Sequence, residues 1–277
     1  MSSPHNPKEL KVLWSAIADS KTGKSNKEPT AKVMGIQRLR DNIDGPGIRS
    51  LVLFNTCPLE CDYCLNKIMM QSGIEKEFTP EKLYEALQVD TTYFELSEGG
   101  VTFGGGEPAL QVDFIEQFAD LVIDKWSIIL ETSLNVPREN IARLSRVVDR
   151  WIVDIKDMNP NIYFEYTGHS GNPAYDNLEW LVANGFGERI RVRVPLIPDY
   201  NTPEDQTKSI EKLKAMGLEV EPFTYIKTHS KEEVETTCSM PTPPDDTELV
   251  GELPEAEEIF SYHKPRKIKP YGRKKEV

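Results

Sequence analysis

Six short apolar runs, each separated from the next by a stretch with helical features, constrain the fold of this chain most. Near-continuous apolar character over four or five residues, rich in Val and Ile, is typical of parallel strands buried on both faces. Between the runs, 114–122 and 210–216 carry apolar residues at helical spacing. Alternating strands and helices predict an α/β fold with a parallel sheet. The six expected strands are 50–54, 100–103, 127–131, 151–155, 190–194 and 218–221.

Two of the expected helices have recognisable first turns. Thr79 and Thr202 each precede a Pro and a Glu, so the Thr side chain can cap free backbone amides while Pro occupies the first turn. Because parallel crossovers are right-handed, six such units curl into a partial barrel, (βα)6, or a wound sheet. A closed barrel needs two more units than the sequence shows. We expect the functional side chains at the carboxyl ends of the strands.

The six units define an expected core of residues 34–235. Residues 1–33, which mix polar residues around a modest apolar patch, are expected to be an N-terminal extension. Residues 236–277 are expected to be a charged tail, because 245–258 carries seven acids and 264–275 carries seven bases.

Charge and hydropathy disfavour several classes of protein. The chain has 33 Lys and Arg against 45 Asp and Glu, and its net charge of −12 repels phosphate backbones and anionic lipids. No stretch reaches the run of about 18 apolar residues that a membrane helix needs, and the first residues lack the apolar centre of a signal peptide. We therefore expect a cytoplasmic protein that binds neither nucleic acid nor membrane.

Three of the four cysteines stand in one short segment. Cys57, Cys61 and Cys64 come directly after the first apolar run, at an expected strand end. Disulfide frameworks spread their cysteines over small secreted domains, so this grouping indicates metal or redox chemistry rather than idle thiols. Zinc would need a fourth Cys or His, and no His follows before His169. Three thiolates can instead bind three irons of a four-iron cluster and leave the fourth iron open.

The segment Cys57-Pro-Leu-Glu-Cys61-Asp-Tyr63-Cys64 resembles the CxxxCxΦC motif of the radical S-adenosylmethionine superfamily, with Tyr63 as the aromatic residue. Within that superfamily the chain is most similar to the activating enzymes of glycyl-radical enzymes. The resemblance runs from about residue 35 to residue 225, through 44–49, the cysteine segment, 99–108, 154–156 and 193–201.

The resemblance implies an oxidoreductase that reductively cleaves S-adenosylmethionine to a 5′-deoxyadenosyl radical. That radical would take a hydrogen atom from a backbone glycine of a partner glycyl-radical enzyme. One [4Fe-4S] cluster on Cys57, Cys61 and Cys64 is expected, because residues 65–103 contain no cysteine for a further cluster. A flavodoxin or ferredoxin-type electron donor and anaerobic operation are also implied, since an open iron is readily oxidised.

Other expected site residues follow from the same resemblance. Gly104, Gly105 and Gly106 lack Cβ atoms and let backbone carbonyls approach the methionyl ammonium, to which Glu107 adds an acceptor charge. A tight turn or a phosphate cradle is the alternative for this segment. The remaining expected cofactor contacts, of which Lys156 is also expected to act in catalysis, are Tyr63, Asn66, Glu131, Asp154, Lys156 and Arg193.

A monovalent cation is implied beside the cofactor. Glu131, Thr132 and Asp154 are the expected ligands, with Glu131 where the family usually has Asp. A surface salt-bridge network is the alternative. Arg191 has the same strand face as Arg193 and competes with it for the place beside the cofactor.

Asp44 is the expected contact for the substrate, because the matching family segment lines the way to the glycyl peptide. Turn formation by Asp-Gly-Pro-Gly is the alternative. Two other functions stay open at this point. The same radical chemistry could act on a small molecule of deazapurine type or on another peptide, or the chain could be a non-catalytic iron–sulfur or zinc scaffold.

Overall fold

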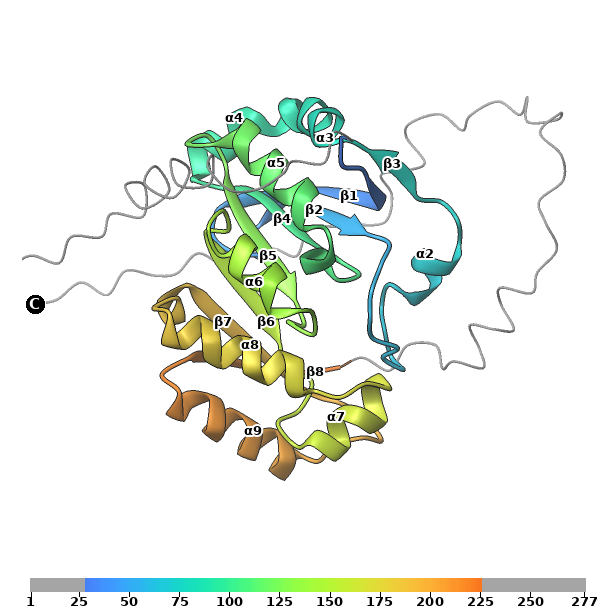
Figure 1. Ribbon diagram of the computed structural model, residues 1–277, viewed down its shortest axis with the longest axis vertical. Helices are drawn as coiled ribbons and strands as arrows, with labels where there is room; N and C mark the ends of the chain where they lie inside the picture. Colours follow the sequence, from blue (N-terminus) through green and yellow to red (C-terminus); the bar gives the residue numbers. More distant parts are fainter. Residues whose placement is uncertain (1–27, 226–277) are drawn as a thin grey trace, which may run out of the picture. The chain divides into compact units, whose positions relative to one another are not determined.

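The computed structural model describes residues 28–225, which form one open eight-stranded sheet with helices packed against it (Figure 1). The chain divides into units of residues 1–239 and 240–277, and all described residues belong to the first. The strands are β1 (Ala31–Asp41), β2 (Ile48–Phe54), β3 (Lys76–Phe78), β4 (Gly100–Gly105), β5 (Ser127–Thr132), β6 (Arg150–Asp154), β7 (Ile190–Leu196) and β8 (Glu219–Thr224).

The helices alternate with these strands along the chain. None of them, within residues 28–225, has the length and hydropathy to cross a membrane. The α-helices are α2 (Lys67–Gln71), α3 (Pro80–Leu87), α4 (Thr91–Ser97), α5 (Val112–Val122), α6 (Arg138–Leu144), α7 (Pro160–Thr167), α8 (Asn172–Ala183) and α9 (Pro203–Ala215). Short 3₁₀ turns are η1 (Gln88–Asp90), η2 (Pro108–Leu110) and η3 (Gly187–Arg189).

The expected α/β fold of six parallel units is confirmed. All six predicted strands are present, as β2 and β4 to β8, and each pairs in parallel with the next. The sheet order is β3-β1-β2-β4-β5-β6-β7-β8, and the described strands do not close into a barrel. The expected Thr caps are also present, with Thr79 accepting from the Lys82 amide and Thr202 from the Asp205 amide.

Two antiparallel strands at one edge of the sheet were not predicted. β1 pairs with β2, and the three-residue β3 pairs with β1. β1 buries its first residues but exposes most of its second half, so it lacks the alternation that marks a strand, and β3 has no buried residue. Residues 31–33 of the expected extension thus begin β1. Residues 1–27 of that extension and the whole expected tail lie outside the described residues.

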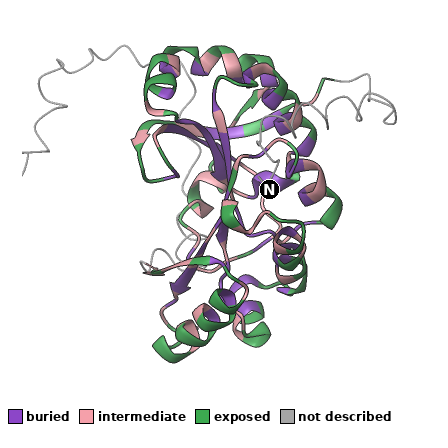
Figure 2. Ribbon diagram, turned by 90° about the vertical axis from the view of Figure 1, so that its left-hand side faces the viewer, coloured by how far each residue is buried: buried purple, intermediate pink, exposed green. Residues whose placement is uncertain are grey.

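The core lies between one face of the sheet and the helices. Val101 and Phe103 of β4 point to this face, where Phe103 stacks on Phe54 and meets the edge of Phe118. Figure 2 shows the result, with strands that are largely buried and helices that expose one side to solvent. By strand alternation, Thr102 and Gly104 point to the opposite, inner face. The inner face carries the charged strand residues Glu131, Asp154 and Arg193 as well as the apolar Leu51 and Leu53.

Arg49 of β2 is a fully buried cation that joins three elements at the amino ends of the parallel strands. Its Nε donates to Thr102 Oγ1 at 2.8 Å, and its Nη2 donates to the carbonyl oxygens of Val101 at 2.7 Å and Ser127 at 2.8 Å. Burial lowers the pKa of Arg49 to about 10, so the guanidinium remains charged at neutral pH. These bonds fix the register of β2, β4 and β5.

We expect Arg49→Leu to lower the free energy of unfolding by about 3 kcal/mol, because buried acceptors lose a charged donor. Urea unfolding followed by tryptophan fluorescence measures the change. Arg191→Leu is the matched control, since Arg191 is 39% exposed and its pair with Glu221 should contribute less than about 1 kcal/mol. Equal losses for the two variants would contradict this account.

Candidate active site

The cysteine segment lies at the carboxyl end of β2, beyond the inner face of the sheet. Cys57, Cys61 and Cys64 are free thiols of intermediate exposure. The end of α7 holds the segment from one side. The Glu60 amide donates to the Thr167 carbonyl at 2.9 Å, and the Asp62 amide donates to the Tyr166 carbonyl at 3.3 Å.

The end of β4 holds the segment from the other side. The Gly106 amide donates to the Phe54 carbonyl at 2.8 Å, and a Cβ at Gly106 would lie 2.2 Å from the Thr56 carbonyl oxygen. Gly105 has a φ of +90° and would place a Cβ 2.7 Å from Leu53 Cα. Glycine is therefore required for backbone packing at both positions. Asn66 Nδ2 donates to the Gly105 carbonyl at 2.8 Å and ties the two segments together.

Glu107 is buried at 1% exposure and uses both carboxylate oxygens within the protein. Oε1 accepts from the Ala109 amide at 3.0 Å and from the Thr132 hydroxyl, and Oε2 accepts from the Ser133 amide at 2.9 Å and its hydroxyl at 2.7 Å. Burial raises the pKa of Glu107, although these donors favour the carboxylate. Through its bonds to Thr132 and Ser133, Glu107 fixes the chain at the end of β5 and just beyond it.

A network of charged residues crosses the inner face from β5 to β7. Arg193 forms an ion pair with Glu131 and donates from Nε to Asp154 Oδ1 at 2.7 Å. Lys156 Nζ lies 3.2 Å from Asp154 Oδ2 and 3.2 Å from the Tyr225 hydroxyl. The side chains of Glu131, Asp154, Lys156 and Arg193 thus lie together on the inner face. The strand register brings these side chains together, because Asp154 of β6 lies directly opposite Arg193 of β7.

Charge and burial shift the titration of these groups in different directions. Burial alone would raise the pKa of Asp154, but Lys156 and Arg193 hold it below its ordinary value. Burial would lower the pKa of Lys156, but Asp154 raises it well above its ordinary value. Burial raises the pKa of Glu131 despite its pairing with Arg193. Asp154 contacts both cations, Arg193 through Oδ1 and Lys156 through Oδ2, and these contacts favour its ionised form.

Tyr63 is buried at 4% exposure within a group of tyrosines beneath the cysteine segment. Its hydroxyl donates to Asp199 Oδ2 at 2.7 Å, and its ring lies 5.9 Å from that of Tyr200 and 6.4 Å from that of Tyr166. Cys61 packs against the same group. The structure therefore shows Tyr63 as a support of the segment, and its expected contact with the cofactor stays a prediction.

Three residues of the site were not predicted. Tyr225 follows β8 and accepts from Lys156, and Asp199 accepts from Tyr63. Lys67, at the start of α2, has a buried Nζ with no hydrogen-bond partner among the described residues. A signal existed for Tyr225, because it stands at a strand end as the cysteines do. Nothing in the sequence indicates the burial of the Lys67 ammonium.

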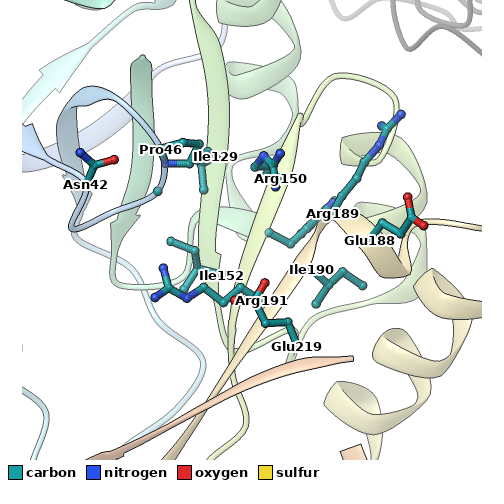
Figure 3. Close-up of a pocket in the computed structure, with 12 residues that line it drawn as sticks. Asn42, Pro46, Ile129, Arg150, Ile152, Glu188, Arg189, Ile190, Arg191 and Glu219 are labelled. Atoms are coloured by element: carbon teal, nitrogen blue, oxygen red, sulfur yellow. The ribbon is translucent and has the colours of Figure 1, made fainter. Parts of the chain in front are cut away.

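Asp44 lies apart from the cysteine segment. It precedes β2, whereas the cysteines follow it, and its buried carboxylate is paired with Arg40. The neighbouring turn lines a cavity of about 300 Å³ at the amino ends of β6, β7 and β8 (Figure 3). Arg191 also lines this cavity and pairs with Glu221 at 2.8 Å, so Arg193 is the arginine of the charged network. The cavity carries charges of both signs, from Arg150, Arg189, Arg191, Glu188 and Glu219.

The cysteine segment fits an iron–sulfur cluster by the chemistry of its donors. Burial raises the pKa of Cys57 to about 12 and that of Cys61 to about 11, so these thiols ionise at neutral pH only when a metal stabilises the thiolate. No group of three His, Cys, Asp or Glu in residues 28–225 is arranged around one metal ion. A four-iron cluster instead takes each thiolate on a different iron.

Comparison with known proteins identifies the class. Residues 51–206 match the family described as the Radical SAM superfamily. The chain belongs to this superfamily. Its relatives include the pyruvate formate-lyase-activating enzyme of Clostridium pasteurianum, at 32% identity over 62% of this chain and 70% of the relative. The pyruvate formate-lyase 1-activating enzyme of Escherichia coli K12 is 28% identical over 68% of this chain and 78% of the relative.

Other relatives and structures agree with this class. The (2S)-3-sulfopropanediol dehydratase activating enzyme of Klebsiella oxytoca is 28% identical over 64% of this chain and 74% of that protein. Streptococcus suis SuiB bound to S-adenosylmethionine shares the fold, with a TM-score of 0.50 at 13% identity over 66% of this chain and 42% of SuiB. The family implies S-adenosylmethionine and a [4Fe-4S] cluster for this chain.

We expect Asp154→Asn to lower the free energy of unfolding of the cluster-free chain by about 3 kcal/mol, because Lys156 and Arg193 lose a buried carboxylate. Denaturant titration at pH 7 measures the loss. The difference from wild type should narrow as the pH falls below about 4, because the Asp154 carboxylate of the unfolded chain then takes up a proton while that of the folded chain, whose pKa is held lower, stays ionised until the pH falls further. Asp113→Asn, which alters an exposed pair with Arg143, should cost less than about 1 kcal/mol.

Proposed function

We propose that this chain is the activating enzyme of a glycyl-radical enzyme. It would use S-adenosylmethionine to install a radical on a backbone glycine of that partner. The observation that carries the proposal is the cysteine segment, fixed between β4 and α7 at the carboxyl edge of a parallel sheet. The names of its relatives, which are activating enzymes, support the choice of partner.

Each part of the site has a role in this proposal. Cys57, Cys61 and Cys64 would hold the cluster, and the carbonyls at the end of β4 would accept from the methionyl ammonium. When bound, the cluster and S-adenosylmethionine supply a low-potential electron and the 5′-deoxyadenosyl radical. The protein groups position the reacting parts and exclude competitors. Lys156 and Arg193 keep the inner face charged and ordered beside Cys61.

The monovalent cation at Glu131, Thr132 and Asp154 stays a prediction. In the structure Arg193 bonds both carboxylates, and the Thr132 hydroxyl is directed to Glu107. The guanidinium therefore already supplies a positive charge between Glu131 and Asp154. Binding a cation there would require these oxygens to change partners.

A flavodoxin or ferredoxin-type donor would supply the electron. Apolar side chains next to the cysteine segment support this part of the proposal, because Leu65 is 65% exposed and Ile68 is 39% exposed. Exposed apolar residues of this kind suit a transient protein contact. The Asp44 turn is proposed to contact the partner's glycine segment, at the other end of the inner face.

The central test uses protein reconstituted anaerobically with iron and sulfide, then reduced with dithionite in the presence of S-adenosylmethionine. We expect 5′-deoxyadenosine and methionine in equal amounts by chromatography. With the partner enzyme added, electron paramagnetic resonance should show a glycine-centred doublet. Cleavage without that doublet for any glycyl-radical enzyme of the source organism would favour a small-molecule substrate, and no cleavage at full cluster loading would exclude an enzyme of this class.

Single replacement of Cys57, Cys61 or Cys64 by Ala should remove the brown colour and lower cofactor cleavage more than about 100-fold, because the cluster loses one of its three protein ligands. Visible absorbance and iron analysis measure the first effect. Cys238→Ala is the matched control, and it should keep both iron and activity. Full activity in Cys61→Ala would refute the ligand assignment.

A further inference from the structure

Exposed apolar side chains form a stripe along one side of α4 and of the 3₁₀ turn η1 before it. The stripe consists of Val89, Tyr93 and Leu96, whose spacing places them on the same side of the helix. Leu96 is 83% exposed and Val89 is 71% exposed, the two highest values among the large apolar side chains of residues 28–225. Phe94 is fully buried, so α4 contacts the core by another side. Single exposed apolar side chains are ordinary, but three on one side of a short helix indicate an interaction surface.

The described part of the chain begins close to this stripe. The Thr30 hydroxyl donates to Glu77 Oε1 at 2.7 Å, and Ala31 pairs with Phe78 of β3. From β3 the chain enters α3, which leads through η1 to α4, as Figure 1 shows. The eight residues of α3 span about 12 Å, because an α-helix rises about 1.5 Å per residue. The stripe therefore lies about one short helix away from the place where residues 1–27 join the described chain.

Residues 10–17, which lie outside the described residues, carry the complementary pattern in their sequence. A helix over this segment would place four apolar side chains on one side, those of Leu10, Leu13, Trp14 and Ile17. Residues 18–27 connect this segment to the described chain and can span up to about 33 Å when extended. This length is more than enough to bring the segment past α3 to the stripe.

Charge favours the same pairing. α4 and the residue after it carry two exposed acids, Glu95 and Glu98, and no base. Residues 8–24 carry four lysines against two acids. Opposite charges therefore attract the segment to this helix. A second copy of the chain or a partner protein would have to compete with a segment that is tethered nearby at a high effective concentration.

We propose that residues 10–17 bind the stripe of Val89, Tyr93 and Leu96 as an amphipathic helix. The apolar side of the segment would cover the three side chains, and its lysines would lie near the acids of α4. The occupant of the stripe is thus a segment of the same chain. The proposal is independent of the proposed function, because no residue of the candidate active site takes part in it.

Binding to α4 would also act on the turn before β2, to which Asp44 belongs. Ser97 Oγ, at the end of α4, accepts from the Ile48 amide at 2.8 Å. A Cβ at Gly47 would lie 2.5 Å from the Ser97 carbonyl oxygen, so the turn packs directly on α4. A segment bound to α4 would therefore stabilise this turn against local opening.

Trypsin digestion of the anaerobic, full-length holoenzyme tests the proposal, because the cleavage rate of a bound segment follows the fraction that is released. Lys11 lies inside the segment, and Lys24 lies in the connection and serves as the internal reference. Mass spectrometry measures the ratio of the two cleavage rates. Relative to the same ratio in a synthetic peptide of residues 1–27, cleavage after Lys11 should be about 10-fold slower in the wild-type chain.

Leu96→Ser should speed cleavage after Lys11 about fivefold and leave cleavage after Lys24 unchanged, because the stripe loses its most exposed apolar side chain. The exposure of Leu96 also means that the far-ultraviolet circular dichroism should stay as in wild type. Phe164→Ser is the matched control, since Phe164 is 57% exposed on α7 and lies outside the stripe. This control should leave both cleavage rates unchanged.

Trp14→Ser is the reciprocal variant, because it alters the segment and leaves the stripe intact. Hydrogen exchange of the α4 amides should become about fivefold faster in this variant, since α4 loses the segment that covers it. The amides of α9 should keep their wild-type exchange rates. Unchanged exchange in α4 would contradict the proposal.

Other outcomes would overturn it as well. Equal ratios in the wild-type chain and the peptide would show that the segment is not bound. Equal acceleration in Leu96→Ser and Phe164→Ser would assign the effect to general stability and not to the stripe. Protection of Lys11 that rises with protein concentration would assign the stripe to a second copy of the chain. Protection that appears only after a glycyl-radical enzyme is added would assign the stripe to that partner.

Discussion

The backbones at the ends of β2 and β4 approach so closely that a single methyl group at Gly106 would lie 2.2 Å from the Thr56 carbonyl oxygen. This contact is the constraint on which the site depends. It fixes where the chain leaves β2, and hence where Cys57 begins the cysteine segment. Glu107 is the next residue along the chain after Gly106. Its carboxylate accepts hydrogen bonds from the hydroxyls of Thr132 and Ser133 and so fixes the end of β5 relative to the end of β4.

Ion pairs on the inner face fix a second part of the site. Glu131, Asp154, Lys156 and Arg193 come from three adjacent strands and the residues just after them, so their pairing depends on strand register and on the sequential order of the sheet. Buried ion pairs of this type contribute little net stability, but the loss of one member leaves an unpaired charge. The network therefore acts mainly to hold side chains in one arrangement next to Cys61.

Much of this organisation could be predicted from the sequence. The six parallel strands were visible because each is a compact apolar run, and the cysteine segment was visible because three thiols at this spacing suit an iron–sulfur cluster and little else. β1 was missed since half of it faces solvent without an alternating pattern. Residue spacing does not encode three-dimensional contacts. It therefore could not show that Tyr225 accepts a hydrogen bond from Lys156, or that the Lys67 ammonium is buried without a hydrogen-bond partner among the described residues. The same is true of Asp44, whose position before β2 sets it at the end of the strands opposite the cysteines.

The described sheet ends in β3 on one side and β8 on the other, and these two strands do not meet. An internal segment of another protein can enter a closed barrel only through one of its two mouths, doubled back on itself so that both flanking segments cross the same opening. A sheet with two separate margins adds a lateral route. A loop of a folded protein can then approach the inner face from the side, with its two flanking segments apart and still attached to their own domain.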